Sequence, residues 1–397
     1  MKQGWQIKRL GEICDILNGF AFKSNEYVKE GVRVIRITNV QKGRIVDEDP
    51  KYFPVKRSNE ILKYILQDGD LLMSLTGNVG RVGIISSSLL PAALNQRVAC
   101  LRIKDKTISI KYLFHLLNSN LFEKDCISSA SGIAQLNMST KWLEQYEMVI
   151  PPPSEQQRIV NLLDAECAKI DALKANAEKN LQNAKDLFQA ALKKELEPKE
   201  GWKKDFLSKI AYISRGRSQH RPRNEASLYG GNYPFIQTGD IRDANGGTIS
   251  TYNQTYSEIG LQQSKLWKKG TICITIAANI GETAILGMDA CFPDSVVGII
   301  PDNQVVCTDF LNYCLIKEKD ELNEIAHGTA QKNINVAILE KVLITYPIEI
   351  TIQQSIVARL DALNEKCKTL QANYEKTLIL CEDLKQALLR KAFNGEI

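Results

Sequence analysis

Loops rich in arginine, asparagine and glutamine are the part of this sequence with the clearest chemical potential. The most basic of them, residues 215–223, carries four arginines around Gly216 and Pro222. Guanidinium groups neutralise phosphates, and Arg, Asn and Gln side chains can form paired hydrogen bonds with base edges in the DNA major groove. This run is therefore a candidate DNA contact, although a charged run is most often simply a solvated loop.

Candidate DNA-contacting residues occur in both halves of the chain, at loops and strand ends. In the first half they are Phe22, Lys23, Arg36, Asn39, Asn78, Arg81, Gln96, Arg97 and Gln135. In the second half they are Arg215, Arg217, Arg221, Arg223, Gln237, Asn279, Gln331, Lys332 and Asn333. We expect Arg221 and Arg223 to contact phosphates, and one of Gln237, Gln331 or Asn333 to contact a base.

No familiar catalytic motif accompanies these loops. The sequence has no Gly-x-x-x-x-Gly-Lys-Ser/Thr phosphate loop, no Gly-x-Gly-x-x-Gly fingerprint, no Gly-x-Ser-x-Gly elbow and no Asn/Asp-Pro-Pro-aromatic loop. Its ten cysteines include no Cys-x-x-Cys pair and its three histidines are scattered, so we predict no catalytic residue, no metal site and no cofactor. A nuclease or methyltransferase with an unrecognised site is the enzymatic alternative.

Composition indicates an ordinary soluble protein. Hydrophobic residues make up 44% and charged residues 24% of the 397 residues, which excludes a disordered chain. The net charge of +5 permits a polyanionic partner without indicating one. No apolar run is long enough for a membrane span and no signal-like core follows Met1, so we expect a cytoplasmic protein with no membrane partner.

The chain is an internal repeat, which decides its architecture. Trp5 matches Trp202 at an offset of 197 (202 − 5), and Gln156-Gln157 matches Gln353-Gln354 at the same offset. Between these points the offset drifts by a few positions, as loop insertions would cause. Each half begins with about 145 residues of short strand and turn signals and a few short helices.

Each half then ends in one long helical segment with a heptad-like apolar spacing. The predicted seam of the first helix is Ile159, Leu162, Glu166, Ile170, Leu173, Ala177, Leu181, Ala184, Phe188 and Ala191. That of the second is Ile356, Leu360, Leu363, Cys367, Leu370, Tyr374, Thr377, Cys381, Leu384 and Leu388. Ser154, after three prolines, is the expected N-cap of the first helix.

A long helix with one apolar stripe needs a partner to be stable. Because a globular domain lies between the ends of the two helices, antiparallel pairing within the chain is the simplest arrangement. The alternatives are that each helix packs on its own domain, or that it pairs with another chain.

In combination, these features resemble the specificity subunit of type I restriction–modification systems, over essentially the full length. The segments that carry the resemblance are Leu17–Lys23, Gly69–Leu72 with Thr76–Gly80, Leu94–Gln96, Ile150–Gln157 and Arg390–Glu396. The resemblance implies an α+β fold with two pseudo-repeated mixed α/β target-recognition domains, separated by two long helices that form an antiparallel intramolecular coiled coil.

The resemblance also implies a division of labour. Target-recognition domains at 1–150 and 198–346 would each read half of a split sequence in double-stranded DNA, and helical spacers at 151–197 and 347–397 would separate them. The helices would dock methyltransferase subunits, which carry S-adenosylmethionine, and a restriction/translocase subunit would use ATP. The subunit itself would be non-catalytic. A coiled-coil adaptor with two protein- or ligand-binding heads, without DNA binding, is the alternative from another class.

Overall fold

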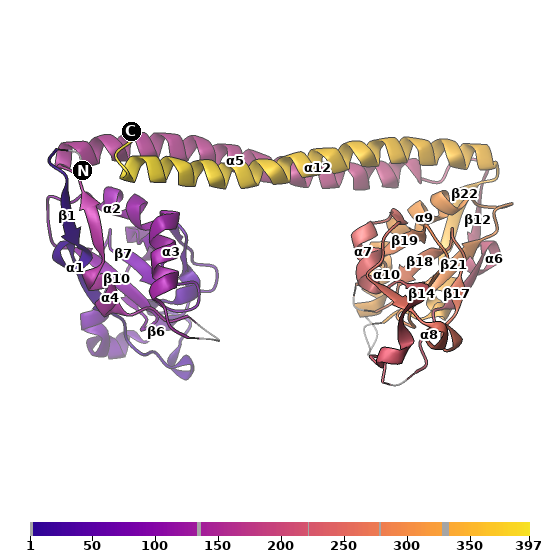
Figure 1. Cartoon of the computed structure of the whole chain (residues 1–397), viewed down its shortest axis with the longest axis horizontal. Coiled ribbons are helices and arrows are strands. Elements are labelled where there is room, and N and C mark those ends of the chain that lie inside the picture. Colours follow the sequence, from indigo (N-terminus) through magenta and orange to yellow (C-terminus); the bar gives the residue numbers. More distant parts are fainter. Residues whose placement is uncertain (1–2, 133–135, 221, 278, 328–332) are drawn as a thin grey trace. The chain divides into compact units, whose positions relative to one another are not determined.

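The chain folds into two compact units (Figure 1). The computed structural model describes residues 3–132, 136–220, 222–277, 279–327 and 333–397. The first unit comprises Met1–Glu178 and Glu375–Ile397, and the second comprises Lys179–Tyr374. Each unit therefore holds one mixed α/β domain together with a stretch of both long helices.

The first half of the chain contributes eleven strands and five α-helices within its described residues. Its strands are β1 Gln6–Arg9, β2 Cys14–Asn18, β3 Val32–Ile35, β4 Val40–Gln41, β5 Arg44–Ile45, β6 Tyr52–Phe53, β7 Leu71–Ser74, β8 Val82–Ile84, β9 Ala92–Leu94, β10 Val98–Ile103 and β11 Glu147–Ile150. Its helices are α1 Leu10–Ile13, α2 Ile110–Leu117, α3 Asn120–Ser129, α4 Thr140–Gln145 and α5 Pro153–Glu195.

The second half follows the same order with small insertions. Its strands are β12 Trp202–Phe206, β13 Ala211–Arg215, β14 Tyr229–Phe235, β15 Thr248–Ile249, β16 Gln254–Tyr256, β17 Leu266–Trp267, β18 Ile272–Thr275, β19 Thr283–Leu286, β20 Ala290–Cys291, β21 Val296–Pro301 and β22 Leu343–Pro347. Its helices are α6 Leu207–Ile210, α7 Thr238–Ala244, α8 Glu258–Gln262, α9 Thr308–Lys317, α10 Lys319–His327, α11 Val336–Glu340 and α12 Ile350–Phe393.

The sheet topology repeats as the sequence does. The order β2-β10-β7-β8 in the first unit corresponds to β13-β21-β18-β19 in the second, where β15 extends the sheet. The order β6-β3-β9 corresponds to β16-β14-β20, and each three-strand set contains one parallel pair. A two-stranded ribbon, β1 with β11 or β12 with β22, leads into each long helix. The predicted repeat of two mixed α/β domains is confirmed.

The long helices have 43 residues in α5 and 44 in α12, or roughly 65 Å each. α5 begins at Pro153, so Ser154 lies inside the first turn and the predicted N-cap at that residue is wrong. Proline suits the first helical position because its missing N–H would have no partner there. The helices occupy most of the predicted spacers, while the division into four domains stays a prediction.

Pairing of α5 with α12 is antiparallel in both units. In the first unit Lys385 Nζ lies 3.0 Å from Asp171 Oδ1. In the second, Arg359 Nη2 lies 2.7 Å from Glu195 Oε2. A residue early in α5 is thus paired with one late in α12, and a residue late in α5 with one early in α12. This confirms the predicted antiparallel coiled coil (Figure 1).

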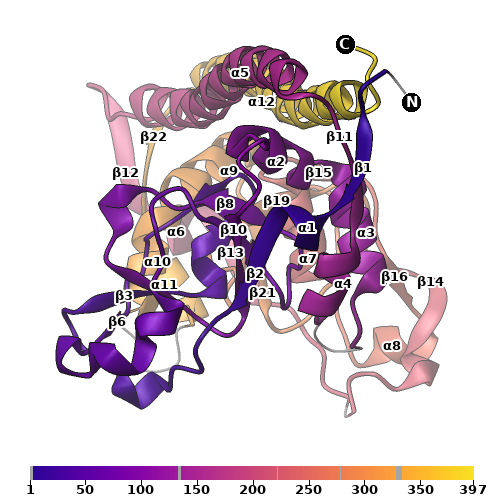
Figure 2. The ribbon, with the colours of Figure 1, turned by 90° about the vertical axis from the view of Figure 1, so that its left-hand side faces the viewer.

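Each helix also packs on its own domain, so the apolar stripe is wider than a two-helix seam. Leu163 shares one core with Tyr112 of α2 and with Ala392 of α12. In the second unit Leu192 of α5 and Leu360 of α12 share a core with Phe310 of α9. Figure 2 shows α2 lying between the helical pair and the strands of the first unit.

Three predicted seam residues lie elsewhere. Leu173, Leu370 and Leu384 are 55%, 40% and 55% exposed, so their assignment to the seam is wrong. The sequence spacing did not distinguish them because the stripe is set by two contacts, one with the partner helix and one with the domain. Leu163 and Cys167, rather than Leu162 and Glu166, are the residues buried at this level.

A buried glutamine joins each long helix to its domain. The side-chain oxygen of Gln156 accepts from the backbone N–H of Ser109 at 2.8 Å, and its amide donates to the carbonyls of Thr107 (3.1 Å) and Pro151 (2.9 Å). Gln353 repeats the arrangement with the N–H of Cys307 (2.8 Å) and the carbonyls of Val305 and Pro347 (both 2.9 Å). We call each set of three bonds a glutamine clamp.

Loss of a clamp should destabilise its unit. Gln156→Ala leaves one buried N–H and two carbonyls without their partner, and we expect the free energy of unfolding to fall by roughly 3 kcal/mol. Urea denaturation followed by circular dichroism measures the change. The matched control is Gln157→Ala, next along the helix and exposed, where we expect less than about 0.5 kcal/mol. Equal losses in the two variants would contradict a structural role for the clamp.

Candidate nucleic-acid interface

Two of the predicted DNA contacts in the first half are structural residues. The ring of Phe22 is 9% exposed and packs edge-on against Phe20 and Phe53, with ring centroids 5.0 and 5.2 Å apart. Asn39 is 4% exposed; its side chain accepts from the N–H of Arg36 and donates to the carbonyl of Val46, both at 2.9 Å. The burial of the Phe22 ring and the internal hydrogen bonds of the Asn39 amide give both residues a role within the fold, and their assignment as DNA contacts stays a prediction.

A shallow polar hollow in the first unit gathers other predicted residues. Asn78 and Arg81 lie around it with Thr38 and Gln41, and its volume is about 250 Å³. Arg81 Nη1 donates to Gln41 Oε1 at 2.5 Å. Two segments some 40 residues apart in sequence thus place a guanidinium, two amides and a hydroxyl together, which is a suitable set for hydrogen bonds to base edges.

The other predicted residues of the first half have different surroundings. Arg36 is half-buried and its Nη2 lies 3.2 Å from Asp49 Oδ2. Gln96 and Arg97 are exposed, and the carbonyl of Arg97 accepts from the N–H of Leu75 at 3.0 Å. Arg97 therefore lies beside the turn that leads to the hollow. Lys23 is exposed at the start of a 3₁₀ turn, Ser24–Glu26.

In the arginine loop (residues 215–223), Arg215 and Arg223 both contact Asp294, a residue that was not predicted from the sequence. Arg223 Nη2 contacts both oxygens of Asp294, at 2.9 and 2.8 Å, and Arg215 donates to the carbonyl of the same residue. Arg217 donates to Gln219 Oε1 at 2.7 Å. All three arginines are exposed, so these described residues present cations to solvent.

The second half also presents an amide cluster. Gln237 is exposed at the start of α7 and its amide donates to Gln254 Oε1 at 2.5 Å. Asn253 Nδ2 donates to Asp240 Oδ1 at 2.8 Å, while the second oxygen of Asp240 accepts from the N–H of Gln237. Gln254 and Asn253 were missed from sequence because β16 and α7 meet only in the fold.

Equivalent turns hold Asn78 and Asn279. Ser74 Oγ donates to the carbonyl of Asn78, and Thr275 Oγ1 donates to that of Asn279. Both asparagine side chains are exposed, as is Asn333. The scaffold of the turn is thus the same in both units.

The predicted residues Gln135, Arg221, Gln331 and Lys332 lie outside the described residues.

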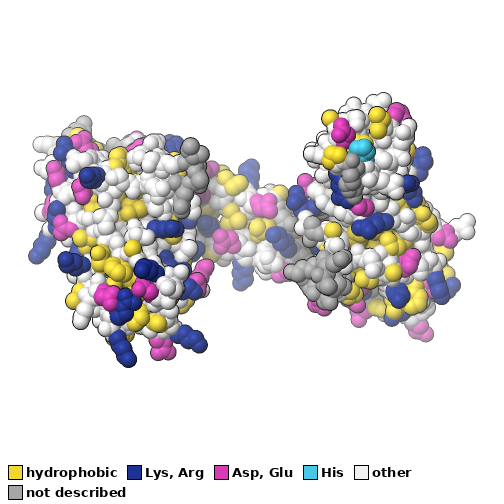
Figure 3. Space-filling model, turned by 90° about the horizontal axis from the view of Figure 1, so that it is seen from below, with side chains coloured by type: hydrophobic (Ala, Val, Ile, Leu, Met, Phe, Trp, Pro, Cys, Tyr) yellow, Lys and Arg dark blue, Asp and Glu magenta, His cyan; other side chains and the backbone are white. Residues whose placement is uncertain are grey.

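The surface carries both signs of charge. Figure 3 shows Lys and Arg side chains spread over the face of each unit that lies opposite its helices, interleaved with Asp and Glu.

Within the described ranges, no group of three or more His, Cys, Asp or Glu side chains could hold a metal ion. No described helix combines the length and the apolarity that a membrane crossing requires.

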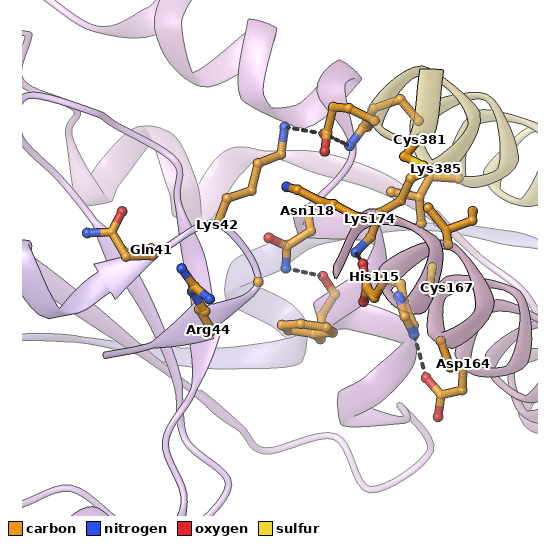
Figure 4. A pocket seen from close by; sticks show the side chains of 18 of the residues that line it. Gln41, Lys42, Arg44, His115, Asn118, Asp164, Cys167, Lys174, Cys381 and Lys385 are labelled. Carbon is orange, nitrogen blue, oxygen red and sulfur yellow. Dashed lines mark hydrogen bonds and ion pairs between the residues drawn. The ribbon is translucent and has the colours of Figure 1, made fainter. Parts of the chain in front are cut away.

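A groove of about 930 Å³ lies between the first domain and its helical pair, lined among others by Lys42, Arg81, His115, Asp164 and Lys385 (Figure 4). We call it the first groove. His115 Nε2 lies 2.8 Å from Asp164 Oδ1, and Lys111 Nζ lies 2.5 Å from the other oxygen. The second unit has a tyrosine in the matching role, because Tyr313 donates to Asp361 at 2.5 Å.

The family is established by comparison with known proteins. The model of the type I restriction modification DNA specificity domain matches residues 2–183 and 199–378. The chain belongs to this type I specificity family. The two matches correspond to the two halves of the repeat, and the resemblance inferred from the sequence is confirmed.

Relatives of the chain are type I specificity subunits. The EcoBI specificity subunit of Escherichia coli is 26% identical, covering 99% of this chain and 86% of the relative. The EcoKI specificity subunit of Escherichia coli strain K12 is 22% identical, covering 100% and 90%.

Solved structures show the same fold. A chain from a study of complex assembly and conformational transition of the type I R-M system superposes with a TM-score of 0.80 at 21% identity, covering 100% of this chain and 99% of the other. The HsdS subunit from Thermoanaerobacter tengcongensis gives 0.56 at 20% identity, covering 100% and 98%.

The His115–Asp164 pair predicts a pH dependence of this type I specificity chain. Burial lowers the pKa of His115 and the charges of Lys385 and Lys111 add to the lowering, while the hydrogen bond that His115 donates to Asp164 opposes it. Burial raises the pKa of Asp164, but hydrogen bonds from Lys111 and His115 outweigh it and lower the pKa overall. Asp164 is therefore a carboxylate in the pH range where His115 titrates.

A histidine whose folded pKa lies below its unfolded pKa stabilises the fold fully at high pH, and this contribution is lost as pH falls, because the unfolded chain takes up the proton first. We expect His115→Gln, whose amide can still donate to Asp164, to lose less stability than the parent between pH 7.5 and pH 5. Unfolding free energies of both proteins at the two pH values give the difference. The same loss in both would show that His115 does not titrate as described.

Proposed function

We propose that this chain is the non-catalytic, DNA-reading subunit of a type I restriction–modification complex. Each α/β domain reads one half of a split sequence in double-stranded DNA, and the paired helices set the separation of the two half-sites. S-adenosylmethionine binds to methyltransferase subunits and ATP to a restriction/translocase subunit, so both cofactors lie outside this chain.

One observation carries the proposal: a repeated scaffold with different polar groups on equivalent surfaces. The turn that holds Asn78 recurs at Asn279 with the same hydroxyl bond. Around it, the first unit has the hollow with Gln41 and Arg81, whereas the second has the arginine loop and the amide cluster at Gln237. A protein that reads two different half-sites needs this combination, because sequence is read by side chains while the scaffold sets their position.

Base and phosphate contacts should respond differently to mutation in the complex reconstituted with its methyltransferase subunits. Arg223→Ala removes a phosphate contact and should lower the slope of log affinity against log salt by roughly 0.9, equally for all DNA sequences. Gln237→Ala removes a base contact and should cost about 1–3 kcal/mol at one position of the second half-site. Affinities at several salt concentrations, on matched and mismatched duplexes, separate the two effects.

Arg81→Ala is the matched variant for the first half-site. It should relax one position there and leave the second half-site intact, which a map of methylated adenines in cells carrying the variant would reveal. If neither Arg81→Ala nor Gln237→Ala alters the sites that are methylated, these surfaces do not read bases. A purified complex without salt-dependent DNA binding would favour the adaptor alternative.

Exposed leucines on the helices support the docking of two methyltransferase subunits. Leu173 and Leu384 are both 55% exposed, and each lies within two residues, along its own helix, of a member of the Asp171–Lys385 ion pair of the first unit. Leu187 and Leu370, at the repeat-related positions of the second unit, are 50% and 40% exposed. Exposed leucines at repeat-related positions of the two units suit two copies of one partner with an apolar helix face.

Charged residues at these positions should weaken assembly. We expect Leu173→Asp with Leu384→Asp to reduce the partner ratio from two methyltransferase subunits per chain to one, because the second pair is untouched. Native mass spectrometry of the mixed subunits measures the ratio. The control is Ala172→Asp with Asp383→Ala, exposed neighbours in the same unit, which should keep both partners. Full assembly of the leucine variant would exclude this surface.

A further inference from the structure

The second unit has a groove between its domain and its helical pair, in the position of the first groove. This second groove has a volume of about 480 Å³ and is lined on its helical wall by Lys185, Gln189 and Lys193 of α5 and by Lys368 and Gln371 of α12. Phe188 and Asn364 complete that wall. Within the described residues, the helical wall contains three cations and no carboxylate.

Two of these three lysine positions carry the opposite charge in the first half of the repeat, while Lys193 corresponds to Arg390. The repeat offset of 197 relates Lys368 to Asp171 and Lys185 to Glu382 (368 − 171 and 382 − 185). In the first groove these carboxylates are paired: Asp171 lies 3.0 Å from Lys385, and Glu382 lies 3.7 Å from Lys42. Packing a domain against the helices therefore does not require lysines at these positions.

The lysines of the second groove are not neutralised from the opposite wall. The described part of the chain offers no salt bridge to Lys185, Lys193 or Lys368, whereas Glu282 on the domain side is already paired with Lys319 at 2.7 Å. Asp320 is exposed at the rim. Three cations at one groove wall without counter-charges repel one another, and an anionic ligand would relieve this cost.

We propose that the second groove binds the sugar–phosphate backbone of DNA without reading its sequence. Lys185 and Lys193 are eight residues apart on one helix, or roughly 12 Å, a length that spans about three to four phosphates at 3.4 Å per strand. The amides of Gln189 and Gln371 between and beside them are donors that suit phosphate oxygens. A single small anion would contact only some of these lysine and glutamine side chains.

This inference rests on the proposed DNA-reading function and adds an asymmetric contact to it. The base-reading surfaces confer preference for a sequence, whereas the groove adds affinity for any DNA on the side of the second half-site. The alternative occupant of a lysine-lined groove is an acidic segment of a partner protein, and the experiment separates the two.

The test uses the complex reconstituted with its methyltransferase subunits. Lys185→Gln, Lys193→Gln and Lys368→Gln together should weaken binding to matched and mismatched DNA by the same factor and lower the salt slope by about 2 to 3, since each phosphate contact contributes about 0.9. The control combines Lys179→Gln, Lys194→Gln and Lys366→Gln. These exposed lysines lie on the same helices and in the same unit but do not line the groove, and their loss should change the slope by less than about 1.

A second variant keeps the fold secure by using charges that the repeat already accommodates. Lys185→Glu with Lys368→Asp places the carboxylates of the first groove in the second, and should reduce affinity for all DNA further than the glutamine variant. Lys179→Glu with Lys366→Asp is its control. Thermal denaturation of each variant confirms that the chain is folded.

The outcomes are distinct. Groove variants that match their controls in slope and affinity would overturn the proposal, as would unchanged DNA binding with weakened subunit assembly, which would identify an acidic protein segment as the occupant. Preference for matched over mismatched sites tests the proposed reading function separately, and the groove variants should retain it. A parent complex that binds no DNA at all would overturn both.

Discussion

A helix of more than 40 residues with a single apolar stripe is unstable in water unless that stripe is covered, and this constraint organises the whole chain. Here α5 and α12 cover each other in antiparallel fashion and share their remaining apolar surface with the domains. Because α5 leads out of the first domain and α12 out of the second, antiparallel pairing returns the end of the chain to the first unit. Duplication of the domain and helix thus supplies each long helix with the partner that covers its apolar stripe.

The architecture was predictable because its signals are long and duplicated. The match of Gln156 with Gln353 and the heptad spacing identified the repeat and the two long helices. The first turn of α5 and the exposure of Leu173 were not predictable in this way. They depend on which face of the helix meets the domain, and spacing alone does not contain that information.

The candidate site was predictable in its location and less so in its residues. Asn78 and Arg81 do meet at a polar hollow, but Gln41 completes it through a contact that only the fold creates. Asn39 has the right side chain for reading a base, yet both of its hydrogen-bonding groups are used inside the protein. The presence of a polar residue in a loop does not show whether its hydrogen-bonding groups already have partners inside the protein, so the bonds of Asn39 could not be foreseen from the sequence.

The glutamine clamps have a consequence for how such a chain can change over time. Each clamp makes its hydrogen bonds to the domain with main-chain atoms, one N–H and one carbonyl at the start of α2 or α9, and a third bond goes to the carbonyl that precedes its own helix. These hydrogen bonds therefore do not depend on which side chains the domain carries. A different domain with the same backbone conformation at this point can accept the same three hydrogen bonds. Recombination between genes can therefore exchange a whole domain and retain the glutamine clamp.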